Sequence, residues 1–267
     1  MGWNLLLVLF IVSLIGCCMG FKNYIWFLNV GYGGSVAVIG LTLIIMMLTG
    51  TLPFNVCSLL QCLLFIGYGL RLALYTLIRD LKNKEYQKVV GAEFGTDMKF
   101  FLKFIIWIYC GALYVAETSP AFFRLYNHSG PTVCQWIGLV ISVIAVTIES
   151  LADKQKTEQK KVNLNMVATK GLYKMCRCPN YFGEILFWTG HFIGAFDILK
   201  GGQWIMAGIA WVAIVFIMFN GAQRLEKRQN KRYGAMQEYW AYVNKTPIII
   251  PLLPIYHLNK VENKEAK

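Results

Sequence analysis

The sequence predicts an all-α, polytopic membrane helical bundle with about seven transmembrane helices. Of its 267 residues, 57% are apolar and only 15% are charged, whereas a soluble domain is about 45–50% apolar and about 25% charged. The mean hydropathy is +0.49. Apolar stretches close to the spanning length of about 20 residues recur along the chain, and the basic residues between them alternate in a way that fits a membrane topology.

The predicted spans are seven apolar stretches, at 3–20, 28–49, 54–78, 99–117, 133–151, 182–199 and 203–222. Together they cover over half of the chain, which leaves little sequence for a separate soluble domain. We therefore expect residues 1–267 to form a single integral membrane domain. Within it, residues 1–60 hold the first two spans and carry no assignable motif.

The distribution of lysine and arginine predicts the orientation. Basic residues gather between the third and fourth stretches, between the fifth and sixth, and after the seventh, whereas the loops on the other side carry only Arg124 and Lys200. Basic loops stay in the cytoplasm, so the N-terminus is expected outside or in the lumen and the C-terminus in the cytosol. The net charge of +12 then reflects topology and the lipid bilayer as partner, and no nucleic acid is expected. The oligomeric state stays open.

Two residues of the third stretch are candidate catalytic groups. Ionisable residues inside a span are costly and are by default functional hypotheses. Tyr68, Arg71 and Tyr75 share one helix face, and a phenol beside a guanidinium can protonate or polarise a carbonyl. We therefore predict Tyr68 and Arg71 as catalytic. The alternative is a structural ion pair of Arg71, with Glu149 as its partner.

The segment Gly171–Glu184 predicts an anion site at the start of the sixth span. Pro179 suits the first turn of a helix, whose N–H groups favour a phosphate, and Arg177 can add a bidentate contact. Asn180 and Glu184 are one helical turn apart and point into the bundle, where they can bind an amide or a ribose. A cap-and-kink role would explain Pro179 and Asn180, but it would not explain Glu184.

Two further segments extend this prediction on the cytosolic side. Asp153 and Lys156 follow Glu149 on one face of a helix that continues out of the membrane. In the tail, Arg228 and Tyr239 belong to a run of arginines and aromatics that fits a nucleotide, although a charged helix also suits lipid headgroups. Cys176 and Cys178 are a lone pair and the three histidines are scattered, so no metal site is predicted.

These motifs resemble a known family. The segments Gly171–Tyr173 and Arg177–Glu184 resemble the central signature of the steroid 5-alpha-reductase C-terminal-domain family, and flanking blocks resemble it in order over residues 65–255. Such proteins are helical membrane reductases that use NADPH to saturate a carbon–carbon double bond, conjugated to a carbonyl or in a sterol, of a lipid substrate. In a eukaryote the family implies the endoplasmic reticulum. The resemblance and the motifs together give these candidate cofactor-binding residues: Asp153, Lys156, Tyr173, Arg177, Asn180, Tyr181, Glu184, Arg228 and Tyr239.

Two alternatives to the reductase stay open, and one departure from the family pattern suggests the first of them. The central block usually has a histidine where this chain has Cys178, which replaces a cofactor contact or hydrogen-bond partner by a weaker one. A catalytically silent lipid-binding protein is one alternative. An S-adenosylmethionine-dependent methyltransferase of isoprenylated cysteine or phospholipid is the other, because those enzymes share a similar central block. Asn180, Glu184 and Asp153 favour the reductases.

Overall fold

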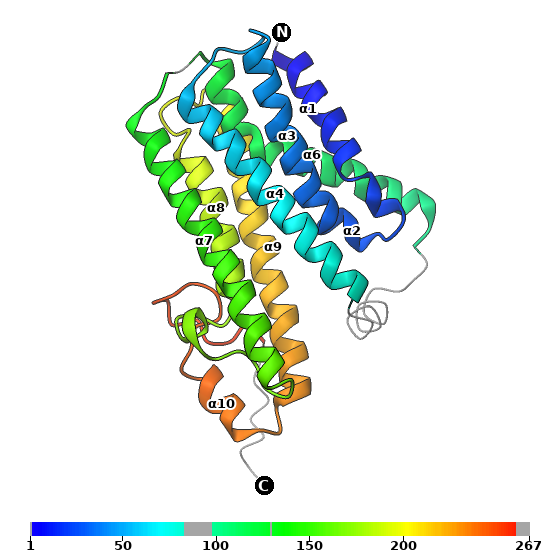
Figure 1. The fold of residues 1–267 in the computed structure, drawn as a ribbon, viewed down its shortest axis with the longest axis vertical. Coiled ribbons are helices and arrows are strands. Elements are labelled where there is room, and N and C mark those ends of the chain that lie inside the picture. The colour runs from blue at the N-terminus through cyan, green and yellow to red at the C-terminus, as the bar shows by residue number, and fades with distance from the viewer. Residues whose placement is uncertain (1, 83–97, 129, 260–267) are drawn as a thin grey trace. The chain divides into compact units, whose positions relative to one another are not determined.

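The computed structural model describes residues 2–82, 98–128 and 130–259, and over these ranges the chain contains helices and no strands (Figure 1). The all-α prediction is therefore confirmed for the described residues. The elements in order are α1 (Gly2–Gly16), η1 (Cys18–Phe21), α2 (Ile25–Leu28), α3 (Val30–Leu48), α4 (Val56–Lys82), α6 (Phe100–Tyr126), α7 (Val133–Val162), η2 (Gly171–Lys174), α8 (Pro179–Ile193), α9 (Gly202–Tyr233) and α10 (Gln237–Val243).

Five of these helices are long and apolar enough to cross a membrane: α3, α4, α6, α7 and α9. Each of the seven predicted stretches overlaps a helix, but α1 and α8 contain 15 residues each, fewer than the roughly 20 that a straight span needs. The multi-pass membrane architecture is thus supported, with five candidate spanning helices among the described residues.

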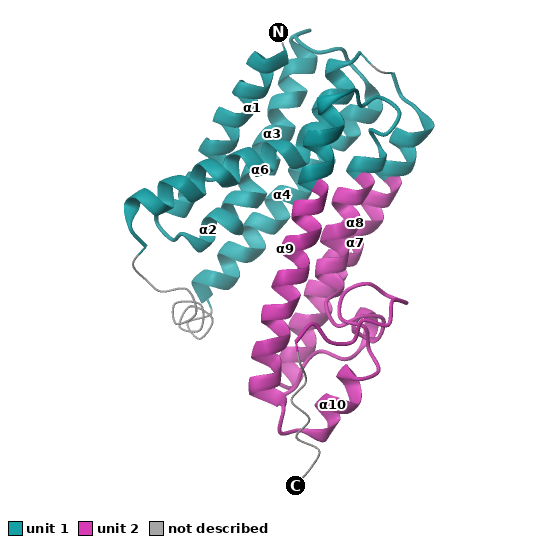
Figure 2. Ribbon diagram, turned by 180° about the vertical axis from the view of Figure 1, so that it is seen from behind, with its two compact units in different colours: residues 1–139, 191–210 teal, residues 140–190, 211–267 magenta. Residues whose placement is uncertain are grey.

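The chain divides into two compact units (Figure 2). Unit 1 contains residues 1–139 and 191–210, and unit 2 contains residues 140–190 and 211–267. The units interleave along the chain, because α7, α8 and α9 each contribute to both. The predicted single integral domain of residues 1–267 stays a prediction.

In unit 1, helices α3 and α4 approach each other through small residues. A Cβ on Gly69 would lie 2.3 Å from the carbonyl oxygen of Gly33, and a Cβ on Gly33 would lie 2.4 Å from that of Gly69. Such close approach is typical of helix pairs in membranes. There the hydrophobic effect does not drive helices together, and van der Waals packing contributes to their association instead. No larger residue fits at either position without separating the helices.

Helix α6 carries a proline inside its apolar stretch and stays continuous. Pro120 has no N–H to bond the carbonyl of Ala116, and the hydroxyl of Ser119 donates to that carbonyl at 2.7 Å instead. One turn later the buried Arg124 donates to the carbonyl of Gly194 at 3.0 Å and pairs with Asp197. The side chain of Arg124 therefore ties the end of α6 to the loop that follows α8.

In unit 2, helices α7, α8 and α9 pack through two glycines. A Cβ on Gly183 of α8 would lie 3.1 Å from the carbonyl oxygen of Ala145 on α7, and a Cβ on Gly221 of α9 would lie 3.4 Å from the ring of Tyr181. Beyond the apolar stretches, the Lys160 ammonium on α7 donates to the hydroxyl of Tyr233 on α9 at 2.8 Å. These contacts hold the polar ends of α7 and α9 together beside the segment Gly171–Glu184.

Candidate functional site

The first residues of the segment Gly171–Glu184 are fixed against α7, before α8 begins. Gly171 adopts a φ of +66°, a conformation that favours glycine, and its Cβ position would lie 2.3 Å from Oε1 of Gln155. That oxygen accepts a hydrogen bond from the backbone N–H of Leu172 at 2.8 Å. Helix α8 then begins at Pro179, as the sequence predicts.

The centre of the site is a buried ion pair between Arg177 and Glu226. Nη2 of Arg177 donates to Oε1 of Glu226 at 2.7 Å, and both side chains are almost completely buried. The other carboxylate oxygen of Glu226 accepts from the backbone N–H groups of Leu258 and Asn259, both at 2.9 Å. A carboxylate with this many donors can remain charged in the interior. The pair joins the central block, which we define as residues 171–184, to the C-terminal part of α9.

The C-terminal strap, which we define as residues 247–259, closes over this ion pair. The backbone N–H groups of Arg177 and Cys178 donate to the carbonyls of Pro247 and Ile248 at 2.8 and 2.9 Å. Nη2 of Arg177 also donates to the carbonyl of Tyr256. The strap is therefore held to the central block by main-chain hydrogen bonds at one end and by the side chain of Arg177 at the other.

The imidazole of His257 makes a second connection between the strap and the helices. Its Nδ1 lies 3.1 Å from Oε1 of Glu226, and its Nε2 lies 3.0 Å from Oδ1 of Asn244, just after α10. The carboxylate of Glu226 thus receives contacts from Arg177, His257 and the strap backbone. It is the residue around which this end of unit 2 is organised.

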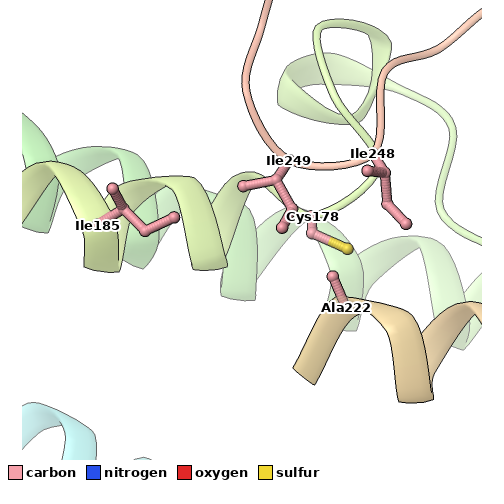
Figure 3. Packing of buried hydrophobic residues seen from close by; sticks show 5 residues of the cluster. All are labelled: Cys178, Ile185, Ala222, Ile248 and Ile249. Carbon is pink, nitrogen blue, oxygen red and sulfur yellow. The ribbon is translucent and has the colours of Figure 1, made fainter. Parts of the chain in front are cut away.

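Cys178, the departure from the family pattern, is an apolar packing residue. Its side chain lies among Ile248, Ile249, Ala222 and Ile185 (Figure 3). Burial raises the pKa of the thiol to about 11, so the group is neutral at pH 7 and is a poor nucleophile. The strap and α9 leave this position enclosed by hydrocarbon.

Three of the predicted cofactor residues are linked to this thiol by electrostatic interactions. The positive charges of Arg177 and Lys156 act to lower the pKa of the Cys178 thiol, against the larger effect of its burial. Burial raises the pKa of the Tyr239 phenol, and the guanidinium of Arg177 opposes this shift. Lys156, Arg177 and Tyr239 therefore share one electrostatic environment, although the first two come from α7 and the central block and the third from α10.

Tyr173 links the central block to α7 and to α10. Its hydroxyl donates to the carbonyl of Ala152 at 3.3 Å, and its own carbonyl accepts from the hydroxyl of Tyr242 at 2.6 Å. Asp153, which follows Ala152 directly, is buried at the same level of α7. Asp153 and Tyr173 are thus brought into the same region as Lys156.

The four remaining predicted cofactor residues line α8 and α9. Asn180 is the second residue of α8 and is half-buried. Tyr181 packs against Gly221, the buried Glu184 accepts a hydrogen bond from the indole N–H of Trp188 at 2.9 Å, and Arg228 is half-buried on α9. The cofactor roles of these residues stay predictions.

The predicted catalytic pair lies in unit 1. The phenol of Tyr68 is fully buried and donates to the hydroxyl of Tyr32 on α3 at 3.3 Å. The guanidinium carbon of Arg71 lies 6.0 Å from the centre of the Tyr68 ring. Because Glu149 belongs to unit 2, the alternative ion pair of Arg71 stays a prediction, as does the catalytic role.

Sequence reasoning missed two residues of these clusters. Glu226 lies in a run of arginines and aromatics whose pattern predicts nucleotide contacts by Arg228 and Tyr239, and this pattern does not single out the carboxylate of Glu226. Tyr32 lies in the second apolar stretch, where a lone tyrosine is usually an interface or packing residue. Periodicity within one helix reveals neighbours on that helix, but it does not reveal a partner on another.

Comparison with known proteins identifies the family. The model of DUF1295, a protein family of unknown function, matches residues 18–246, so the family region begins in the N-terminal part that the sequence motifs left unassigned. A relative is Steroid 5-alpha-reductase DET2 of Gossypium hirsutum, 26% identical over 104 residues. That alignment covers 38% of this chain and 35% of the relative, about a third of each.

No solved structure matches this chain. The family match covers most of the sequence, and a partial similarity to a steroid 5-alpha-reductase accompanies it. The chain therefore belongs to the DUF1295 family of steroid 5-alpha-reductase-like proteins.

Proposed function

We propose that this protein is an NADPH-dependent membrane reductase that saturates a carbon–carbon double bond conjugated to a carbonyl in a lipid. Family membership and the partial similarity to a steroid 5-alpha-reductase support a membrane reductase. The observation that carries the proposal is the buried phenol of Tyr68, which is hydrogen-bonded to Tyr32 and has the Arg71 guanidinium near its ring. The substrate class is a steroid or sterol, a polyprenal or an enoyl lipid.

Tyr68 would act on the carbonyl end of the substrate. NADPH, when bound, supplies a hydride to the β-carbon of the enone. With Tyr32 as the donor within the hydroxyl pair, the single O–H of Tyr68 would donate to the carbonyl oxygen and stabilise the negative charge that develops there. The resulting enolate takes up one proton from solvent at its α-carbon, so that one hydride and one proton are added across the double bond. Arg71 favours the charged oxygen by its positive charge.

The donors of unit 2 suit the phosphates of NADPH. Nε of Arg177 is buried and has no hydrogen-bond partner among the described residues, so this guanidinium keeps a donor in addition to those that contact Glu226 and Tyr256. Lys156, Asn180 and Arg228 are each half-buried and add cationic or amide donors. Arg177, Lys156 and Arg228 would hold the phosphates, and Asn180 at the start of α8 would contact the ribose or the amide.

The proposed function includes a topology. We propose seven membrane crossings, with α1 and α8 as short ones, the N-terminus outside or luminal and the C-terminus cytosolic. Lys156, Arg177 and Arg228 then lie on the side where NADPH is supplied. Engineered glycosylation sequons between residues 163 and 170 are expected to stay unmodified. Sugar on any of them would overturn this orientation.

The test is ligand-dependent stability of the purified protein in lipid nanodiscs. A ligand that binds only the folded state raises the apparent melting temperature, so NADPH is expected to raise it and S-adenosylmethionine is not. NADPH oxidation is then followed with a 3-oxo-Δ4 steroid, a polyprenal and an enoyl thioester. A rise with S-adenosylmethionine alone would favour the methyltransferase. Binding of neither, without turnover, would favour a silent lipid-binding protein.

A matched set of variants tests the cofactor residues. Asn180→Ala and Arg228→Ala are expected to weaken NADPH binding about tenfold or more, since each removes a charged or polar contact worth about 1.5 kcal/mol. Lys227→Ala is the control, because Lys227 is adjacent to Arg228 on α9 but exposed. Equal affinities in all three variants would contradict the assignment.

A further inference from the structure

The strap carries an apolar loop that points away from the protein. Residues 250–255 read Ile-Pro-Leu-Leu-Pro-Ile, and the loop is closed at its base by a hydrogen bond from the N–H of Ile248 to the carbonyl of Ile255 at 2.8 Å. Leu252 is 97% exposed, and Leu253 and Ile255 are exposed as well. Leu252 has a φ of +71°, a conformation that side-chain-bearing residues rarely adopt. The backbone thus presents a leucine outward in a conformation that its side chain disfavours.

The base of this loop lies at the end of the apolar stretch of α9. Ile248 and Ile249 belong to the cluster of Ala222, against which Val215, Phe219 and Leu225 of α9 also pack. Val215 lies about 13 Å along the helix from Arg224, the first exposed charge after the apolar stretch, at about 1.5 Å per residue. The strap therefore packs against α9 around the boundary that Arg224 marks. Ile248 and Ile249 lie beside the end of the apolar stretch, and Leu258 and Asn259 contact Glu226 beyond it.

The backbone of the loop is suited to a medium without water. In hydrocarbon every N–H without a partner is costly, and the two prolines at 251 and 254 remove two of these donors from the loop. The N–H groups of Leu253 and Ile255 donate within the loop, to Ile250 at 3.3 Å and to Leu253 at 2.7 Å. The composition and the hydrogen bonds thus lower the cost of placing an irregular segment beside lipid.

We propose that residues 250–255 are immersed in the bilayer, where they anchor the strap from the cytosolic leaflet. Leu252 and Leu253 contact acyl chains near the headgroup boundary, and the exposed basic residues Arg224 and Lys227 of α9 face the anionic headgroups above them. The anchor fixes the strap, and with it Arg177 and Glu226, at the membrane boundary. The proposal needs only that α9 spans the membrane, and it is independent of the enzymatic reaction.

An environment-sensitive label on Leu252 tests this directly. Cys18 and Cys134 are the two cysteines that are not buried, so Cys18→Ser with Cys134→Ser gives a background in which an added cysteine is labelled selectively. Leu252→Cys is labelled with a nitrobenzoxadiazole fluorophore in vesicles. Val162→Cys is the control, because Val162 is 89% exposed at the polar end of α7. Neither substitution disturbs packing.

The expected result is a blue-shifted emission at position 252 that phospholipids with a nitroxide group high on the acyl chain quench strongly. The label at position 162 is expected to emit as in water and to resist quenching. A spin label at position 252 should likewise collide with oxygen more than with a water-soluble nickel complex. Water-like emission at position 252 would overturn the proposal. So would a label shielded from both lipid and water, because a second protein copy would then cover the loop.

Discussion

Arg177 and Glu226 form an ion pair of 2.7 Å in which both side chains are almost completely buried. Removal of one partner leaves an uncompensated charge in the interior, which typically costs about 3–5 kcal/mol. We expect Glu226→Gln to lower stability by an amount of this order, since the amide still fills the space but no longer balances the guanidinium. Thermal unfolding in nanodiscs measures the effect as a fall in apparent melting temperature.

The control for this prediction is the exposed pair Lys154 and Glu158 on α7, whose charged atoms lie 4.0 Å apart. Exposed pairs contribute about 0–1 kcal/mol, so Glu158→Gln is expected to leave the melting temperature almost unchanged. Equal effects of the two substitutions would show that the buried pair does not organise this end of unit 2.

The local elements of this site were predictable, but their partners were not. The spacing of Pro179 and the residues around it predicted where α8 begins, because helix-start signals act within a few residues. The partner of Arg177 lies 49 positions later, at Glu226. That pairing depends on how α8 and α9 pack, and side-chain periodicity within each helix carries no information about it. The strap depends on the same packing.

The second prediction concerns Tyr32 and rests on the proposed reductase function. If the hydroxyl of Tyr32 positions the phenol of Tyr68, Tyr32→Phe should lower kcat about tenfold or more while KM changes little, since a hydrogen-bond donor that is no longer oriented stabilises the developing negative charge less. The solvent isotope effect on turnover should rise as well. An unchanged kcat would show that the hydroxyl pair only packs.

Tyr114 provides the matched control for Tyr32, because its ring packs 4.9 Å from that of Tyr32 and its hydroxyl donates to the carbonyl of Phe27 at 2.7 Å. Tyr114→Phe should cost about 1 kcal/mol of stability and leave kcat unchanged. If both variants lost activity and stability in parallel, the aromatic cluster would be structural.

The third prediction concerns the pH dependence of stability above neutrality. Burial raises the pKa of the Cys176 and Cys178 thiols to about 12 and about 11, from an ordinary value of 9.0. Between pH 9 and the folded-state pKa the unfolded chain loses these protons while the folded chain keeps them. The contribution of the two thiols to the free energy of unfolding should therefore be constant below pH 9. Above pH 9 it should fall by about 1.4 kcal/mol per pH unit for each thiol.

Lysines and tyrosines titrate in the same pH range. The pH dependence of stability is therefore compared between the wild-type protein and the Cys176→Ala, Cys178→Ala double variant. The variant should lose stability less steeply from pH 9 to 11. Parallel curves would indicate that neither thiol is held neutral by the fold.

The fourth prediction uses two glycines of the same helix. A Cβ on Gly69 would lie 2.3 Å from the backbone oxygen of Gly33 on α3, whereas nothing lies within 4 Å of a Cβ on Gly67. Gly69→Ala must separate α3 from α4, and overpacking of this kind costs about 1–3 kcal/mol. Gly67→Ala meets open space and should stabilise α4 by up to about 1 kcal/mol, because alanine is the better helix former. Melting temperatures that shift in opposite directions would establish the close contact of α3 and α4, and a Gly69→Ala protein as stable as wild type would exclude it.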